Sequence, residues 1–234
     1  MAETLGASTF RGWKMSVVFS YRDDDSVGSE EKRVLLEMGC EGGTLPSEVR
    51  ATMSLVAEHA PGRGLKGLPE YAEFQEVQVE VLRPVRTLIE KLMILHNAAL
   101  GNDDDYKRRT ARHYYDVWCL LGDSGVCTDL TRYRAGRLAD EVIARSMAMG
   151  RISPARPASG FADSLAFDAH ANRLVAAQYS TVILDNLLWP EAERPSFAAC
   201  CERVRENAAV LWSQTRREQP AAPILVGDQL SWTR

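Results

Sequence analysis

Two apolar segments that each contain charged residues most constrain how this chain can fold. The first, Arg83–Leu100, has Pro84 where a helix would begin, and its Leu, Ile and Met side chains would cover nearly the whole helix circumference. It nonetheless contains Lys91. The second, Arg108–Leu121, surrounds Asp116 with aromatic and aliphatic residues. Because burying an unpaired charge is costly, each of the two charges needs a partner, a metal or a ligand.

The polar segment Gly101–Lys107 between these helices is expected to be a short loop. Helices joined by such a loop would lie antiparallel, so Lys91 and Asp116 could reach one space. Two interpretations are open from the residues alone. The pair can be a structural ion pair between core helices, or it can be part of a ligand site.

The composition is that of a globular chain of one large domain or two small ones. The 234 residues are 45% hydrophobic and 26% charged, and the net charge of −4 gives no overall attraction to nucleic acid. No apolar run is long enough to cross a membrane. The five cysteines lack Cys-x-x-Cys spacing, so we expect reduced thiols and a cytoplasmic location.

Strand patterns occupy the first part of the chain. Trp13–Tyr21 is rich in β-branched and aromatic residues, Arg33–Cys40 is typical of a buried strand, and Phe74–Leu82 alternates like a half-exposed strand. Later segments are helical in pattern, with helices expected over Leu130–Met149, Asp168–Leu188 and Pro195–Arg217. We therefore predict an α+β fold, with a β-rich domain over residues 1–83 and a mainly helical domain over 84–234.

Glu37 lies inside the second strand candidate. A carboxylate at the end of a buried strand can hold a metal ion for phosphoryl transfer, although a lone strand glutamate is more often a surface or edge residue. The helical half also carries basic residues that form either a binding surface or ordinary solvated charge: Lys107, Arg108, Arg109, Arg112, Arg151 and Arg156.

The sequence RTLIEKLMILH, followed by RHYYDVWCLL, resembles the AbiEii toxins of type IV toxin–antitoxin systems. VLLEMGCEGGTLPSEVRATMSLVAE and FQEVQVEVLRP extend the resemblance backward, and LLWPEAERPSFAACCERV extends it forward, to cover about Trp13–Trp212. These toxins are nucleotidyltransferases of the DNA-polymerase-β superfamily. The resemblance therefore implies a partial polymerase-β-type nucleotidyltransferase sheet followed by a C-terminal helical bundle.

The resemblance also implies roles for individual residues. Lys91 matches a lysine that contacts nucleotide phosphates, and Asp116 matches an aspartate of the same active centre. Arg112 and His113 match flanking nucleotide-binding positions, and Glu37 matches a carboxylate of the metal site. The implied reaction transfers a nucleoside monophosphate from an NTP, with Mg²⁺, to an acceptor such as tRNA or another RNA. A cognate antitoxin is implied that need not form a stable complex.

One departure from the superfamily pattern affects this expectation. The superfamily has a Gly-rich turn and an Asp-x-Asp strand, whose aspartates hold the divalent ions. Neither precedes Glu37, since the Gly-Gly pair of this chain follows that strand and Asp23 and Asp25 lie in a loop candidate. We expect the motif either just upstream of Met1 or lost from a truncated relative.

A polypeptide without this motif is expected to have little or no transfer activity. The alternative is a non-catalytic remnant that binds nucleotide, RNA or a protein partner. A third possibility is a helical interaction module in which the Lys91–Asp116 pair is only structural.

Overall fold

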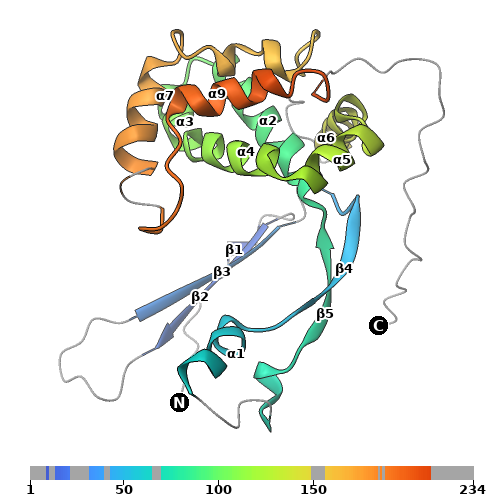
Figure 1. Cartoon of the computed structure of the whole chain (residues 1–234), viewed down its shortest axis with the longest axis vertical. Helices are drawn as coiled ribbons and strands as arrows, with labels where there is room; N and C mark the ends of the chain where they lie inside the picture. Colours follow the sequence, from blue (N-terminus) through green and yellow to red (C-terminus); the bar gives the residue numbers. More distant parts are fainter. Residues whose placement is uncertain are drawn as a thin grey trace.

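The α+β expectation is confirmed by a computed structural model, which describes residues 9–10, 14–21, 32–39, 43–64, 70–148, 156–183, 185 and 188–211. In these ranges every strand precedes Arg83, and the helices of ten or more residues follow it. Figure 1 shows the helices after Arg83, labelled α2 to α9, gathered at one end of the molecule, with the strands and the short helix α1 (Leu55–His59) at the other. The division into two domains at residue 83 stays a prediction.

The first sheet is antiparallel and contains β1 (Thr9–Phe10), β2 (Lys14–Tyr21) and β3 (Lys32–Gly39), in that order. The strands expected over Trp13–Tyr21 and Arg33–Cys40 are therefore present, although Trp13 and Cys40 lie outside the described residues. The expected burial of β3 is wrong, because residues 34–39 are all exposed. The apolar core of the described residues is built from Val85 onward and takes nothing from this sheet.

The second sheet pairs β4 (Ser47–Thr52) with β5 (Val77–Leu82) in antiparallel register. The strand expected over Phe74–Leu82 is present as β5, but its half-exposed character is wrong for residues 77–80, because Val77 and Val79 are exposed as well as the polar residues between them. A short helix, α1 (Leu55–His59), follows β4. The sheet leads directly into the helical part of the chain, since β5 ends immediately before Arg83.

Arg83 joins the second sheet to the helices. Its guanidinium donates to Glu48 of β4 at 2.6 Å and to the buried Asp129 of α5 (Ser124–Tyr133) at 2.8 Å. The Arg83 backbone N–H also donates to the Pro46 carbonyl at 2.8 Å. These bonds fix the point at which the chain leaves the sheet.

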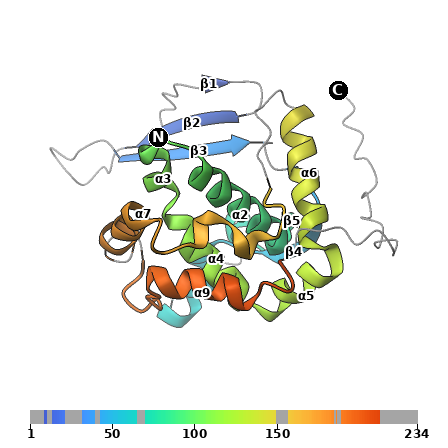
Figure 2. The same ribbon diagram turned by 90° about the horizontal axis from the view of Figure 1, so that it is seen from above.

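Helix α2 (Pro84–Leu100) lies at the centre of the helical part, and Pro84 occupies its first turn as expected. Helix α2 contacts α3 (Asp104–Thr110), α4 (Arg112–Gly122), α5 and α6 (Ala135–Ala148). Figure 2 shows α2 between α4 and α6. Its fully buried side chains form the middle of the core: Val85, Leu88, Ile89, Leu92, Met93 and Leu95.

Some segments that the sequence pattern joined are separate helices. The expected loop over residues 101–107 contains the start of α3, because the Asp103 carboxylate accepts the Tyr106 N–H at 2.9 Å and caps a new helix. The helix expected over Leu130–Met149 is instead α5 and α6, which are separated at Arg134 with φ 63°. Met149 lies outside the described residues.

The two last helices are shorter than expected. The pattern over Asp168–Leu188 forms turns, then α7 (Arg173–Gln178) and a π-helical segment, Tyr179–Ile183. Asp168 begins a turn rather than a helix, since its carboxylate accepts backbone N–H groups from residues 170 and 171. Helix α9 (Phe197–Glu206) begins after its Ser196 cap, and residues from 212 onward lie outside the described ranges.

Among the described residues, none of the helices is both long and apolar enough to cross a bilayer.

The burial of α2 predicts a strong dependence of stability on its core side chains. Leu92→Ala would leave a cavity at a fully buried position, so we expect the free energy of unfolding to fall by about 2–5 kcal/mol. Leu100→Ala on the same helix is the matched control, because Leu100 is 52% exposed. The control should change stability by less than about 0.5 kcal/mol in urea unfolding. Equal effects of the two substitutions would contradict the central position of α2.

Candidate functional site

The Lys91–Asp116 pair joins α2 to α4. Lys91 Nζ lies 2.6 Å from Asp116 Oδ2, so the expected convergence of the two charges is confirmed. His113 Nδ1 lies 3.3 Å from each of these two atoms. We call Lys91, His113 and Asp116 the Lys91 cluster.

The cluster is less buried than the sequence pattern indicated. The side chains of Lys91 and Asp116 are 21% and 38% exposed. Helix α2 is buried on most of its surface, but Thr87, Lys91 and Ile94 are half-buried at helical spacing and form a stripe that reaches the surface. A lysine on this stripe can therefore be reached by a ligand.

The Asp116 carboxyl is held in its ionised form. Burial by itself would raise the pKa of Asp116, but hydrogen bonds from His113 and Lys91 outweigh it, and the pKa lies below its ordinary value. The imidazole Nδ1 faces both an amine and a carboxylate, so its tautomer decides whether it accepts from Lys91 or donates to Asp116. The cluster is therefore a cation and an anion in direct contact.

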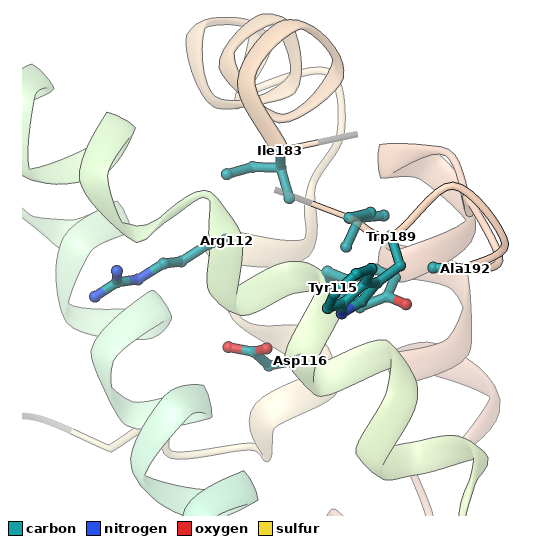
Figure 3. Close-up of a pocket in the computed structure, with 7 residues that line it drawn as sticks. Arg112, Tyr115, Asp116, Ile183, Trp189 and Ala192 are labelled. Atoms are coloured by element: carbon teal, nitrogen blue, oxygen red, sulfur yellow. The ribbon is translucent and has the colours of Figure 1, made fainter. Parts of the chain in front are cut away.

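A pocket of about 350 Å³ begins at Asp116. Helix α4 contributes Arg112, Tyr115 and Asp116, while the segments after α7 contribute Ile183, Leu188, Trp189 and Ala192. In Figure 3, Asp116 lies between Arg112 on one side and the rings of Tyr115 and Trp189 on the other. The volume is within the range of small-molecule sites.

The pocket combines a free cation with aromatic surface. Arg112 is exposed, and no residue that the structure describes forms an ion pair or hydrogen bond with its guanidinium. Tyr115 is stacked on Trp118, with ring centroids 6.2 Å apart and planes at 24°. Arg203 lies over the Trp118 ring at 3.9 Å and holds it in place.

Glu37 lies on β3, in the first sheet. Its exposed carboxylate accepts a hydrogen bond from Ser16 of β2 at 3.4 Å. Lys91 and Asp116 form hydrogen bonds with each other and with His113. The role of Glu37 as a metal ligand stays a prediction, as do the roles of the other residues that the family resemblance implied.

The Lys91 cluster does not fit a divalent ion. Mg²⁺ is held by clustered oxygen ligands, and two-metal sites need several carboxylates. Among the described residues, no group of three or more His, Cys, Asp or Glu side chains could hold a metal. The cluster also offers only one carboxylate, whose Oδ2 is already held by the Lys91 amine. We therefore assign no chemical step to a metal at this cluster.

Most of the basic residues near the cluster are paired locally. Within α3, Lys107 and Arg108 form ion pairs with Asp104 and Asp105, and Arg156 pairs with Asp140 of α6. Arg151 lies outside the described residues. These pairs are partly exposed, and a binding surface formed by the paired residues stays a prediction. Arg112 differs from them because it lines the pocket.

Two pocket residues were not singled out from the sequence. Tyr115 was part of the apolar surroundings of Asp116, and Trp189 was part of a turn that ends a helix. A tryptophan in the polar, proline-containing segment WPEAERP was the available signal, since nothing in such a segment would be expected to bury it.

The comparisons with known proteins give one match. A family model described as "Nucleotidyl transferase AbiEii toxin, Type IV TA system" matches residues 3–203, which include the Lys91 cluster and the pocket. Searches of curated proteins and of solved structures give no match.

The lowered pKa of Asp116 predicts how stability responds to acid. A carboxyl whose pKa is lower in the folded state stabilises the fold above its unfolded pKa, about 3.9, and this stabilisation is lost as the pH falls through the lower folded pKa. We therefore expect Asp116→Asn to be less stable than the wild type at neutral pH, with a difference that shrinks below about pH 4.

Urea unfolding at about pH 7, 5 and 3 measures this difference. Asp163→Asn, which removes an exposed carboxylate outside the Lys91 cluster, is the control and should show a much smaller change between these conditions. A destabilisation by Asp116→Asn that stays constant down to the lowest pH would contradict the stabilising role of the ionised carboxylate.

Proposed function

Because the chain belongs to the AbiEii nucleotidyl transferase toxin family of type IV toxin–antitoxin systems, we propose that it binds the phosphates of an NTP at the Lys91 cluster. In this proposal the cluster positions the NTP for transfer of a nucleoside monophosphate to an acceptor such as tRNA. Family membership itself implies an antitoxin partner. That the antitoxin acts without a stable complex is part of the proposal.

The observation that carries the proposal is that Asp116 is shared: it pairs with the half-buried Lys91 amine and lines the same pocket as Arg112, whose guanidinium has no partner among the described residues. A triphosphate is a multiply charged anion whose oxygens can replace the Asp116 carboxylate as partners of the amine. The planar guanidinium of Arg112 suits two phosphate oxygens at once. Asp116 would then hold Lys91 in place before the nucleotide binds.

The transfer step needs more than these residues. Divalent ions held by several carboxylates neutralise the charge that develops during phosphoryl transfer. The Lys91 cluster offers the single carboxylate of Asp116, which is paired with an amine. We therefore propose that this polypeptide transfers little or no nucleotide.

A non-catalytic protein that binds nucleotide, RNA or a protein partner is the second candidate. The single carboxylate of the Lys91 cluster favours it. It uses the same residues as the first candidate and differs in having no turnover. Binding does not separate the two candidates, and in a transfer assay only Lys91-dependent incorporation would do so, because both candidates predict little or no product.

Nucleotide binding tests the role of Lys91. Lys91→Ala should weaken NTP binding at least about tenfold, which corresponds to the loss of one hydrogen bond to a charged group. Isothermal titration calorimetry measures the affinity. Lys107→Ala is the matched control, because Lys107 lies on neighbouring α3 and pairs with Asp104 at 3.8 Å. Equal affinity of the wild type and Lys91→Ala would contradict the proposal.

The double substitution Lys91→Met with Asp116→Leu removes both charges without leaving one unpaired. We expect this variant to stay folded by circular dichroism and to lose NTP binding, because the fold tolerates an apolar pair in place of ions. A folded double variant that binds NTP like the wild type would show that the ion pair is only structural.

Incorporation of labelled nucleotide into tRNA in the presence of Mg²⁺ tests turnover. The wild-type chain should give no more product than Lys91→Ala, because the Lys91 cluster lacks the carboxylates that hold divalent ions. Incorporation that exceeds this control and disappears on Lys91→Ala would show that the polypeptide is an active enzyme.

A further inference from the structure

We propose that the pocket beside Asp116 binds a nucleobase, which stacks on Trp189 and Tyr115 while the attached phosphate contacts Arg112. This inference rests on the proposed function and adds to it a site for the base. The base can belong to the NTP or to the 3′ nucleotide of an RNA acceptor. The chemistry that the pocket recognises is the same in both cases.

The spacing of three residues on α4 creates the site. Arg112, Tyr115 and Asp116 stand at positions i, i+3 and i+4, so they share one face of the helix. All three line the same pocket. One helical face therefore presents a cation, an aromatic ring and the carboxylate that pairs with Lys91.

Trp189 provides the exposed aromatic surface. Its side chain is 81% exposed, whereas tryptophan is usually among the most buried residues. Its position is set by a turn in which the Ala192 N–H donates to the Trp189 carbonyl at 3.0 Å. An indole that lines a pocket and remains exposed offers a face on which a planar ring can stack.

Tyr115 provides a second ring that is already held in place. It is stacked on Trp118, which lies under the Arg203 guanidinium. Its phenol is neutral at neutral pH, because a tyrosine pKa is ordinarily about 10 and burial and contact with Cys119 raise the pKa of Tyr115 further, so the ring does not repel a phosphate. Little conformational freedom would be lost when a base packs against a ring held in this way.

The arrangement of charge and aromatic surface matches a nucleotide. Figure 3 shows Arg112 and the rings of Tyr115 and Trp189 on opposite sides of Asp116. A nucleotide likewise has charged phosphate at one end and a flat, weakly polar base at the other. The volume of about 350 Å³ is enough for a base and its sugar.

Binding of three probes to the full-length chain tests the inference. The probes are the four NTPs, inorganic tripolyphosphate, and a short single-stranded RNA. The variants are Trp189→Ala, Trp189→Phe and the control Tyr71→Ala, which removes an exposed aromatic ring outside the pocket. Circular dichroism and urea unfolding check that each variant is folded.

We expect Trp189→Ala to weaken the binding of a ligand that carries a base by about 5- to 150-fold, the effect of losing one base–aromatic stack. Trp189→Phe should restore most of the affinity, because it keeps an aromatic face. Tripolyphosphate should bind Trp189→Ala and the wild type equally. A loss confined to NTPs identifies the base of the NTP, and a loss confined to RNA identifies the acceptor; both results support the pocket.

The inference and the proposed function can fail separately. If NTP binding depends on Lys91 and neither NTP binding nor RNA binding depends on Trp189, the base pocket is wrong and the phosphate site stands. If Trp189→Ala weakens the binding of tripolyphosphate as much as that of NTP, the substitution does not act through a base, and the inference is overturned. If the wild type binds neither NTP nor tripolyphosphate, the proposed function fails and the inference fails with it.

Discussion

The ion pair between Lys91 and Asp116 is the interaction on which the site depends. Helix α2 is buried over most of its surface, so a lysine within it is tolerated only where a partner and some solvent are available. Asp116 supplies the partner, and the half-buried stripe of α2 supplies the solvent. The same bond, with the packing of Val117 and Leu121 in the core, fixes how α4 is rotated against α2.

That rotation determines what the rest of α4 presents. With Asp116 directed at Lys91, Arg112 one turn earlier and the adjacent Tyr115 both lie along the pocket. Tyr114 points to the opposite side, where its hydroxyl donates to the Ala166 carbonyl at 2.7 Å. The Lys91–Asp116 pair can therefore be both a structural ion pair and part of a ligand site. The contact that orients helix α4 also orients the groups that can bind a ligand.

The sequence allowed the pair to be predicted but not the pocket. A charge inside an apolar run requires a partner, and this requirement can be recognised from the residues that immediately flank Lys91 and Asp116. The burial of β3 was wrongly predicted because an apolar strand shows only that it could be covered, not that the described helices cover it. Trp189 and Tyr115 line one pocket although their segments are far apart in the chain, and no periodicity within either segment reveals that shared site.

The contact between amine and carboxylate also bears on how the site would work. With Lys91 Nζ 2.6 Å from Oδ2, the amine already neutralises the Asp116 carboxylate, which weakens its attraction for a metal ion. An incoming phosphate instead offers the amine a second anion, and Arg112 adds a positive charge without giving up any ion pair within the described residues. The resting pair thus favours an anionic ligand over a cationic one. The base proposed to stack on Trp189 would add contact area that inorganic phosphate lacks, so the pocket would distinguish nucleotides from phosphate by their bases.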